Sequence, residues 1–108
     1  MNLHVEQRIR SVQAFIDANL SASLQILELA KIAYLSPTQF KKLFTNNLGI
    51  SAYKYITQKR MEKAKALLTH TDLPVQLIAQ QVGYNDLSAF SRRFSLYFGL
   101  SPRALICL

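Results

Sequence analysis

Apolar residues recur at helical spacing along almost the whole chain, in segments separated by short polar or glycine-bearing breaks. From His4 to Leu20 they lie three and four positions apart, which predicts a helix with one buried stripe that includes Phe15. The next apolar set, from Leu24 to Ile32, predicts a short helix capped by one of the serines of 21–23. Because Leu27 adds to its apolar faces, we expect this helix to be surrounded on most sides.

Helix-capping residues divide the middle of the chain. Ser36, followed by Pro37 and Gln39, has the spacing of a capping box and predicts the start of a helix that ends at Gly49. Ser51 is the predicted cap of a longer helix that reaches about residue 69 and has Tyr53 among its inner residues. A helix of that length spans about 28 Å.

The last third of the chain contains three further helical segments. Pro74 begins a helix whose apolar set includes Leu77, and the pair at 83–84, Gly-Tyr, forms a turn. Asp86 is the predicted cap of a helix with an aromatic stripe, and Ser101 caps a final short helix. The whole pattern predicts an all-α fold of seven helices without strands.

The chain also contains an internal repeat. Displaced by 50 residues, several residues fall on equivalents of the same type, and 29–30 match 78–79 at a displacement of 49. The displaced pairs are Tyr34 with Tyr84, Phe40 with Phe90, Phe44 with Phe94, Gly49 with Gly99, Ser51 with Ser101, and Lys42 with Arg92. The same helix pair is therefore present twice, with a longer turn in the second copy. A merely symmetric helical bundle is the alternative interpretation.

The charge balance favours a polyanionic partner. Lys and Arg number 13 against 6 Asp and Glu, a formal net charge of +7. Seven of these cations lie between Lys41 and Lys65, with Glu62 as the one acid. Such a stripe suits phosphate binding, although a solvated helix face has the same composition. Because each copy also places a cation on the exposed side of its second helix, both positions suit major-groove reading.

Other functional classes find little support. Cys107 is the single cysteine, which excludes an internal disulfide and fits a reducing cytoplasm. His4 and His70 have no partner at metal or triad spacing, so we expect no enzymatic activity, no metal and no cofactor. Neither a signal peptide nor an apolar run of about 18 residues is visible, so we expect a cytoplasmic protein without membrane contact.

Several short motifs occur together in the order IA, VGY, F-x-R-x-F and GxSP between Ile78 and Pro102. With LA at 29–30, Ser36, Phe40, Phe44 and the GIS at 49–51, they resemble the AraC/XylS-type DNA-binding domain over about residues 15–102. The resemblance implies a bacterial transcription regulator, most often an activator, with two homeodomain-like helix-turn-helix subdomains. These would occupy about residues 4–49 and 74–106, joined by a linker helix over 51–69.

Carried over by position, the resemblance assigns roles to exposed residues. The base-contact candidates are Thr38, Gln39, Lys41 and Lys42 in the first reading helix, and Leu87, Ser88, Ser91 and Arg92 in the second. The phosphate-contact candidates are Ser36, Thr45, Lys54, Lys59, Arg60 and Arg93. For Arg60, a structural role is the alternative to a phosphate contact. Leu87 stands where a polar reader is common, and either touches a thymine methyl or packs.

The resemblance also has limits. Family members commonly carry an aromatic residue and an arginine after the SP motif, where this chain has Leu105 to Leu108, so contacts from that tail are not assumed. Double-stranded DNA is the expected partner, with RNA polymerase as a further one. The isolated domain is expected to be a monomer. The chain is either a stand-alone short regulator or one domain of a longer protein that has a separate effector or dimerisation domain. The alternative function is a helical protein–protein module with a basic face.

Overall fold

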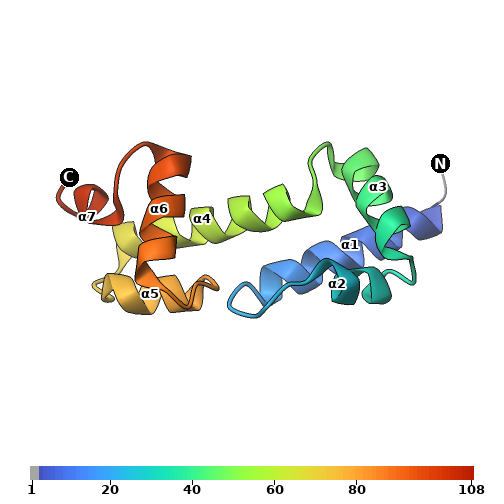
Figure 1. Cartoon of the computed structure of the whole chain (residues 1–108), viewed down its shortest axis with the longest axis horizontal. Coiled ribbons are helices and arrows are strands. Elements are labelled where there is room, and N and C mark those ends of the chain that lie inside the picture. The colour runs from blue at the N-terminus through green and yellow to red at the C-terminus, as the bar shows by residue number, and fades with distance from the viewer. Residues whose placement is uncertain (1–2) are drawn as a thin grey trace. The chain divides into compact units, whose positions relative to one another are not determined.

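The structure is a computed structural model that describes residues 3–108, and within that range it contains seven α-helices and no strand. The all-α prediction is therefore confirmed (Figure 1). The helices are α1 (Leu3–Ala18), α2 (Ile26–Ile32), α3 (Pro37–Leu48), α4 (Ala52–His70), α5 (Val75–Gln81), α6 (Leu87–Phe98) and α7 (Pro102–Ile106).

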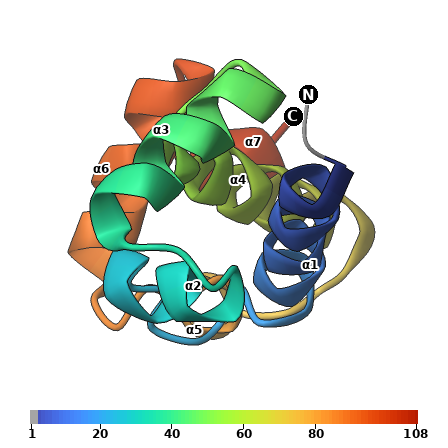
Figure 2. The same cartoon turned by 90° about the vertical axis from the view of Figure 1, so that its right-hand side faces the viewer.

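The chain forms two compact units, Met1–Thr57 and Gln58–Leu108, so the division lies inside α4. In the first unit α1, α2 and α3 pack against one another (Figure 2). Phe44 lies at the centre of its core, with ring centroids 5.6 Å from Phe40 and 5.6 Å from Tyr55. Tyr55 is contributed by α4, and its hydroxyl donates to an Asp17 carboxylate oxygen at 3.0 Å, which ties α4 to α1.

The second unit repeats this packing with α5, α6 and the last turns of α4. Phe90 and Phe94 are fully buried with centroids 5.7 Å apart, and Met61, Ala64 and Leu68 of α4 join the same core. Helix α4 therefore supplies side chains to both cores, from its first turns to one and from its last turns to the other.

The predicted caps of α3, α6 and α7 are confirmed. The Ser36 hydroxyl accepts from the Gln39 backbone N–H while the Gln39 side chain accepts from the Ser36 N–H, a complete capping box. Asp86 accepts from the Ser88 N–H, and Ser101 from the Ala104 N–H. Gly49 ends α3 with φ of 79°, a left-handed conformation that glycine adopts without strain. Both second helices thus begin at the predicted residues.

Other predictions were wrong. Helix α2 begins at Ile26 after Gln25, whose side chain makes no capping bond, so no serine of 21–23 is its N-cap. Only Leu29 and Ala30 of this helix are buried, and Leu27 is 53% exposed, because α2 packs against α1 and α3 with one face only. Three more residues predicted to be inside are exposed, namely Phe15, Tyr53 and Leu77.

The repeat pairing at the turn also needs correction. The Leu35 N–H donates to the Ala30 carbonyl at 3.0 Å, and the Tyr84 N–H donates to the Ala79 carbonyl at 2.9 Å. Tyr84 is therefore the equivalent of Leu35, and the extra residue of the second turn follows it. Tyr34 is instead the equivalent of Gly83, since both have positive φ, 56° and 96°. The shared tyrosine misled the sequence alignment because the one-residue insertion lies just beyond it.

Candidate nucleic-acid interface

The exposed face of α3 lies opposite its buried aromatic residues. Phe40 and Phe44 anchor the helix in the first core. The predicted base-contact residues are all exposed, namely Thr38, Gln39, Lys41 and Lys42. The structure therefore brings these four together on one solvent-facing surface, where two ammonium groups and two smaller polar side chains are available for contacts.

Hydrogen bonds within α3 restrict what some of these side chains can do. Gln39 Oε1 accepts from the Ser36 N–H at 3.5 Å, so the capping box leaves the side-chain amide group of Gln39 as its donor to a ligand. The Ser36 hydroxyl accepts from the Gln39 N–H at 3.2 Å and keeps its own proton to donate. Thr45 donates to the Lys41 carbonyl at 3.0 Å, which commits its proton to the helix. Of the two hydroxyls, Ser36 is the better phosphate donor.

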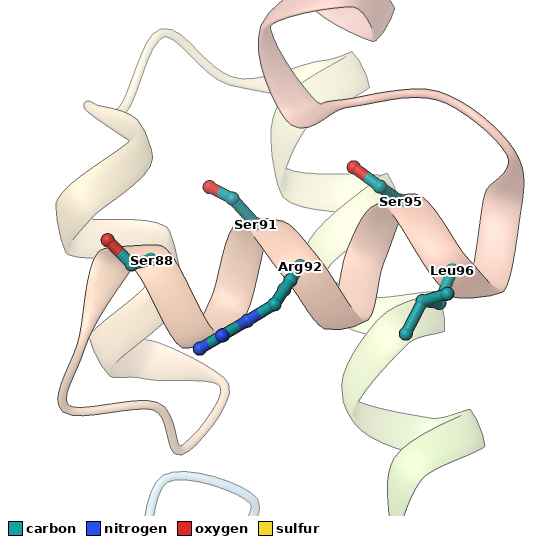
Figure 3. Close-up of a pocket in the computed structure, with 5 residues that line it drawn as sticks. All are labelled: Ser88, Ser91, Arg92, Ser95 and Leu96. Carbon is teal, nitrogen blue, oxygen red and sulfur yellow. The ribbon is translucent and has the colours of Figure 1, made fainter.

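The exposed side of α6 carries a shallow hollow of about 560 Å³, shown in Figure 3. Its lining residues all come from this one helix, and they are Ser88, Ser91, Arg92, Ser95 and Leu96. In the figure the three serines point toward one edge of the helix, whereas Arg92 and Leu96 leave it on the other side. A second hollow, of about 290 Å³, lies next to Arg92 and Leu96 and includes Arg93 and Tyr84. Arg92 therefore lies at the centre of the exposed face.

Sequence reasoning missed two residues of this face, Ser95 and Leu96. They follow Ser91 and Arg92 by one helical turn, so the spacing that identified the first pair also identifies the second. Leu96 is 77% exposed, whereas Leu87, the apolar residue that the sequence singled out, is 36% exposed at the first position of α6.

The phosphate-contact candidates are divided between the two units. Lys54 lies exposed in the first turn of α4, and its backbone N–H donates to the Ser51 hydroxyl at 3.1 Å, which confirms Ser51 as a cap. Lys59 and Arg93 are half-buried. The Arg60 guanidinium lies 5.9 Å from the centroid of the Tyr84 ring, a cation–π distance that gives this residue a structural contact within the second unit.

Two other kinds of feature are absent from the described part of the chain. Among residues 3–108 no three His, Cys, Asp or Glu side chains gather closely enough to hold a metal ion. Over the same residues, none of the helices has the length and apolar character needed to span a bilayer.

Comparison with known proteins adds the family. The model of a helix-turn-helix domain family, of the AraC type, matches residues 29–106. The chain belongs to the AraC/XylS-type helix-turn-helix family. An AraC-type relative, the lactose operon transcription activator of Staphylococcus xylosus, is 35% identical over 97 residues, which cover 90% of this chain and 35% of that protein. The chain spans about a third of the length of the curated relatives that it matches.

Two solved AraC-type structures have the same fold. The C-terminal domain of AraT, a response regulator from Geobacillus stearothermophilus, is 32% identical with a TM-score of 0.90, and the match covers 95% of this chain and 86% of that one. The DNA-binding domain of AdpA, a global transcriptional factor solved in complex with a target DNA, is 25% identical with a TM-score of 0.88, covering 93% and 90%. The similarity to each of the two structures therefore covers nearly the whole of this chain.

Proposed function

We propose that this chain is the sequence-specific DNA-binding domain of a bacterial transcription regulator, and that α3 and α6 each read one segment of major groove. The observation that carries the proposal is the duplicated helix pair, in which the second helix buries two phenylalanines and exposes a cation on the opposite side. The packing of a symmetric helical bundle requires the aromatic stripe, but it does not require cations at equivalent exposed positions. The AdpA domain, which has the same fold, was solved on its target DNA.

The side chains of the two faces suit different tasks. Arg92 can donate two parallel hydrogen bonds to guanine O6 and N7, and Lys41 and Lys42 can approach the same acceptors as point charges. The Gln39 amide group, which the capping box leaves free to donate, suits a base acceptor or a phosphate oxygen. Lys54, Lys59 and Arg93, with the Ser36 hydroxyl, are proposed to hold the phosphate backbone, and Arg60 to support the second unit through Tyr84.

The wider setting follows the relatives. We propose that the regulator is an activator, as the name of the Staphylococcus xylosus relative indicates for that protein, and that it works in the bacterial cytoplasm. RNA polymerase is the proposed protein partner. The isolated domain is proposed to be a monomer that binds no cofactor and has no enzymatic activity. A protein–protein module without a DNA site is not favoured, because the matching family and the AdpA complex both point to DNA.

Selection of random duplexes on the purified chain tests the proposal. The expected result is a bipartite motif whose halves lie about one helical turn, roughly 34 Å, apart. A single short motif would leave only one reading helix in use. Equal retention of every sequence would contradict specific recognition and would reduce both helices to non-specific clamps.

Alanine variants of the two exposed cations are the second test. Lys42→Ala and Arg92→Ala should each weaken the selected site by about 1 to 3 kcal/mol and relax base preference at one position, each in a different half of the motif. Titration of the selected site and of its single-base variants measures both effects. Lys31→Ala, on α2 and paired with Glu28 at 3.5 Å, is the matched control and should change neither. Loss of affinity without a change in base preference would make the cation a backbone contact.

A further inference from the structure

Leu96 is the residue of the α6 face that the roles above leave unexplained. Its side chain is 77% exposed, so it contributes little to the second core, which packs Phe90 and Phe94 on the opposite side of the helix. It lines both hollows beside Arg92. Figure 3 shows the two side chains leaving the helix on the same side. Displaced by 50 residues, the position is Asn46 in α3, so an apolar group stands here in only one of the two copies.

The surroundings of Leu96 leave space for the edge of a base. Ser91 and Ser95 have short side chains, which leave the hollow of about 560 Å³ beside them open. Helical side chains lean toward the N-terminus, so the Leu96 side chain lies over the turn that carries Arg92, while the guanidinium reaches further ahead. The rise from residue 92 to 96 is about 6 Å, or about two base-pair steps.

The major groove displays one apolar group that fits such a side chain, the C5-methyl of thymine. We infer that Leu96 contacts the methyl group of a thymine in the segment read by α6, about two base pairs from the guanine that Arg92 contacts. Leu96 is thereby a specificity-determining residue, and the inference rests on the proposed function. Leu87, with 36% of its surface exposed, offers less apolar area for this contact.

Replacement of single thymines by deoxyuridine tests the contact, because it removes only the methyl group. In the complex of the 108-residue chain with its selected site, one replacement in the half read by α6 should weaken binding about fourfold, because one methyl group is then no longer buried in the interface. Leu96→Ala should weaken the natural site by a similar factor and should no longer distinguish thymine from uracil there. Its thermal unfolding should be unchanged, since the side chain lies outside the core.

Two exposed leucines serve as controls. Leu87→Ala should keep the methyl sensitivity, and Leu27→Ala on α2, 53% exposed in the first unit, should leave affinity unchanged. The assignment is overturned if Leu96→Ala remains as sensitive to deoxyuridine as the unchanged chain, or if Leu87→Ala loses the sensitivity instead. It is also overturned if no thymine methyl in that half affects binding. Failure to select any motif would contradict the proposed function itself, and the inference with it.

Discussion

Tyr34 and Gly83 occupy the same place in the two turns, but only glycine adopts this backbone conformation without strain. Tyr34 has φ of 56° and its side chain is 84% exposed, so packing offsets little of the cost. Hydrogen bonds to backbone carbonyls hold the turn instead. The Arg8 guanidinium donates to the Ala33 carbonyl at 3.2 Å, and the Leu35 backbone N–H donates to the Ala30 carbonyl at 3.0 Å. The first turn therefore stores strain that the second turn lacks.

Replacing Tyr34 with glycine should consequently stabilise the protein. We expect Tyr34→Gly to raise the free energy of unfolding by about 1 kcal/mol, because it relieves the left-handed conformation and removes few contacts. Chemical denaturation with circular dichroism measures the difference. Tyr34→Ala keeps the strain and loses the same side chain, so it should leave stability nearly unchanged. If both variants have the same stability, strain at this residue is not the cause.

Sequence patterns located the residues with local hydrogen-bonding roles and missed those set by packing partners. Ser36 with Gln39 and Asp86 were identifiable because a cap depends on neighbours a few positions away. The exposure of Phe15 and Leu27 depends on which helices pack alongside, which helical periodicity does not reveal. The pairing of Tyr34 failed for a related reason, since residue identity outweighed a backbone conformation that the sequence does not display.

At the scale of elements, α3 and α6 share their anchors and differ in their exposed faces. Both bury two phenylalanines, begin at a capped residue and end at a left-handed glycine. The α3 face carries two lysines, whereas the α6 face carries Arg92 among small serines and Leu96. The exposed side of each helix was predictable from its aromatic stripe. The extent of the α6 face was missed because Leu96 is apolar, although its spacing of one helical turn from Arg92 places it on that face.

Helix α4 offers a test of backbone binding that is separate from base reading. Lys54 is exposed in its first turn, so Lys54→Ala should weaken all DNA sequences alike and reduce the slope of log K against log salt by about 0.9, the effect of one phosphate contact. Titrations of the selected site and of an unrelated duplex at several salt concentrations measure it. An unchanged slope would place Lys54 away from the phosphates, and a loss confined to the selected site would make it a base contact.

At the scale of the whole molecule, the two cores are separate clusters that share one helix. The first contains residues of α1, α2 and α3 with Tyr55, and the second contains residues of α5 and α6 with Met61. The repeat in the sequence predicted two similar subdomains. It did not indicate that the boundary would fall within α4, at Thr57 and Gln58, because a continuous helical pattern runs through that point.

Separate cores predict separate loss of structure. Phe94→Ala removes a fully buried ring from the second core and should destabilise that unit by about 3 to 5 kcal/mol. Hydrogen exchange should then show lost amide protection in α5 and α6 while α1 and α3 retain theirs. The matched variant Phe44→Ala should give the reverse pattern. If either variant removes protection from all these helices together, the units fold as one cooperative structure.

The capping box of α3 has a consequence for how the binding preference of this domain can change in evolution. Thr38, Lys41 and Lys42 are exposed side chains outside the capping box, so substitutions there can alter the preferred operator at little cost in stability. Gln39 is different, because its side chain also accepts from the Ser36 N–H at 3.5 Å. A new side chain at that position changes the start of the helix as well as the surface it presents, which makes Gln39 the least freely adjustable position of the first reading face.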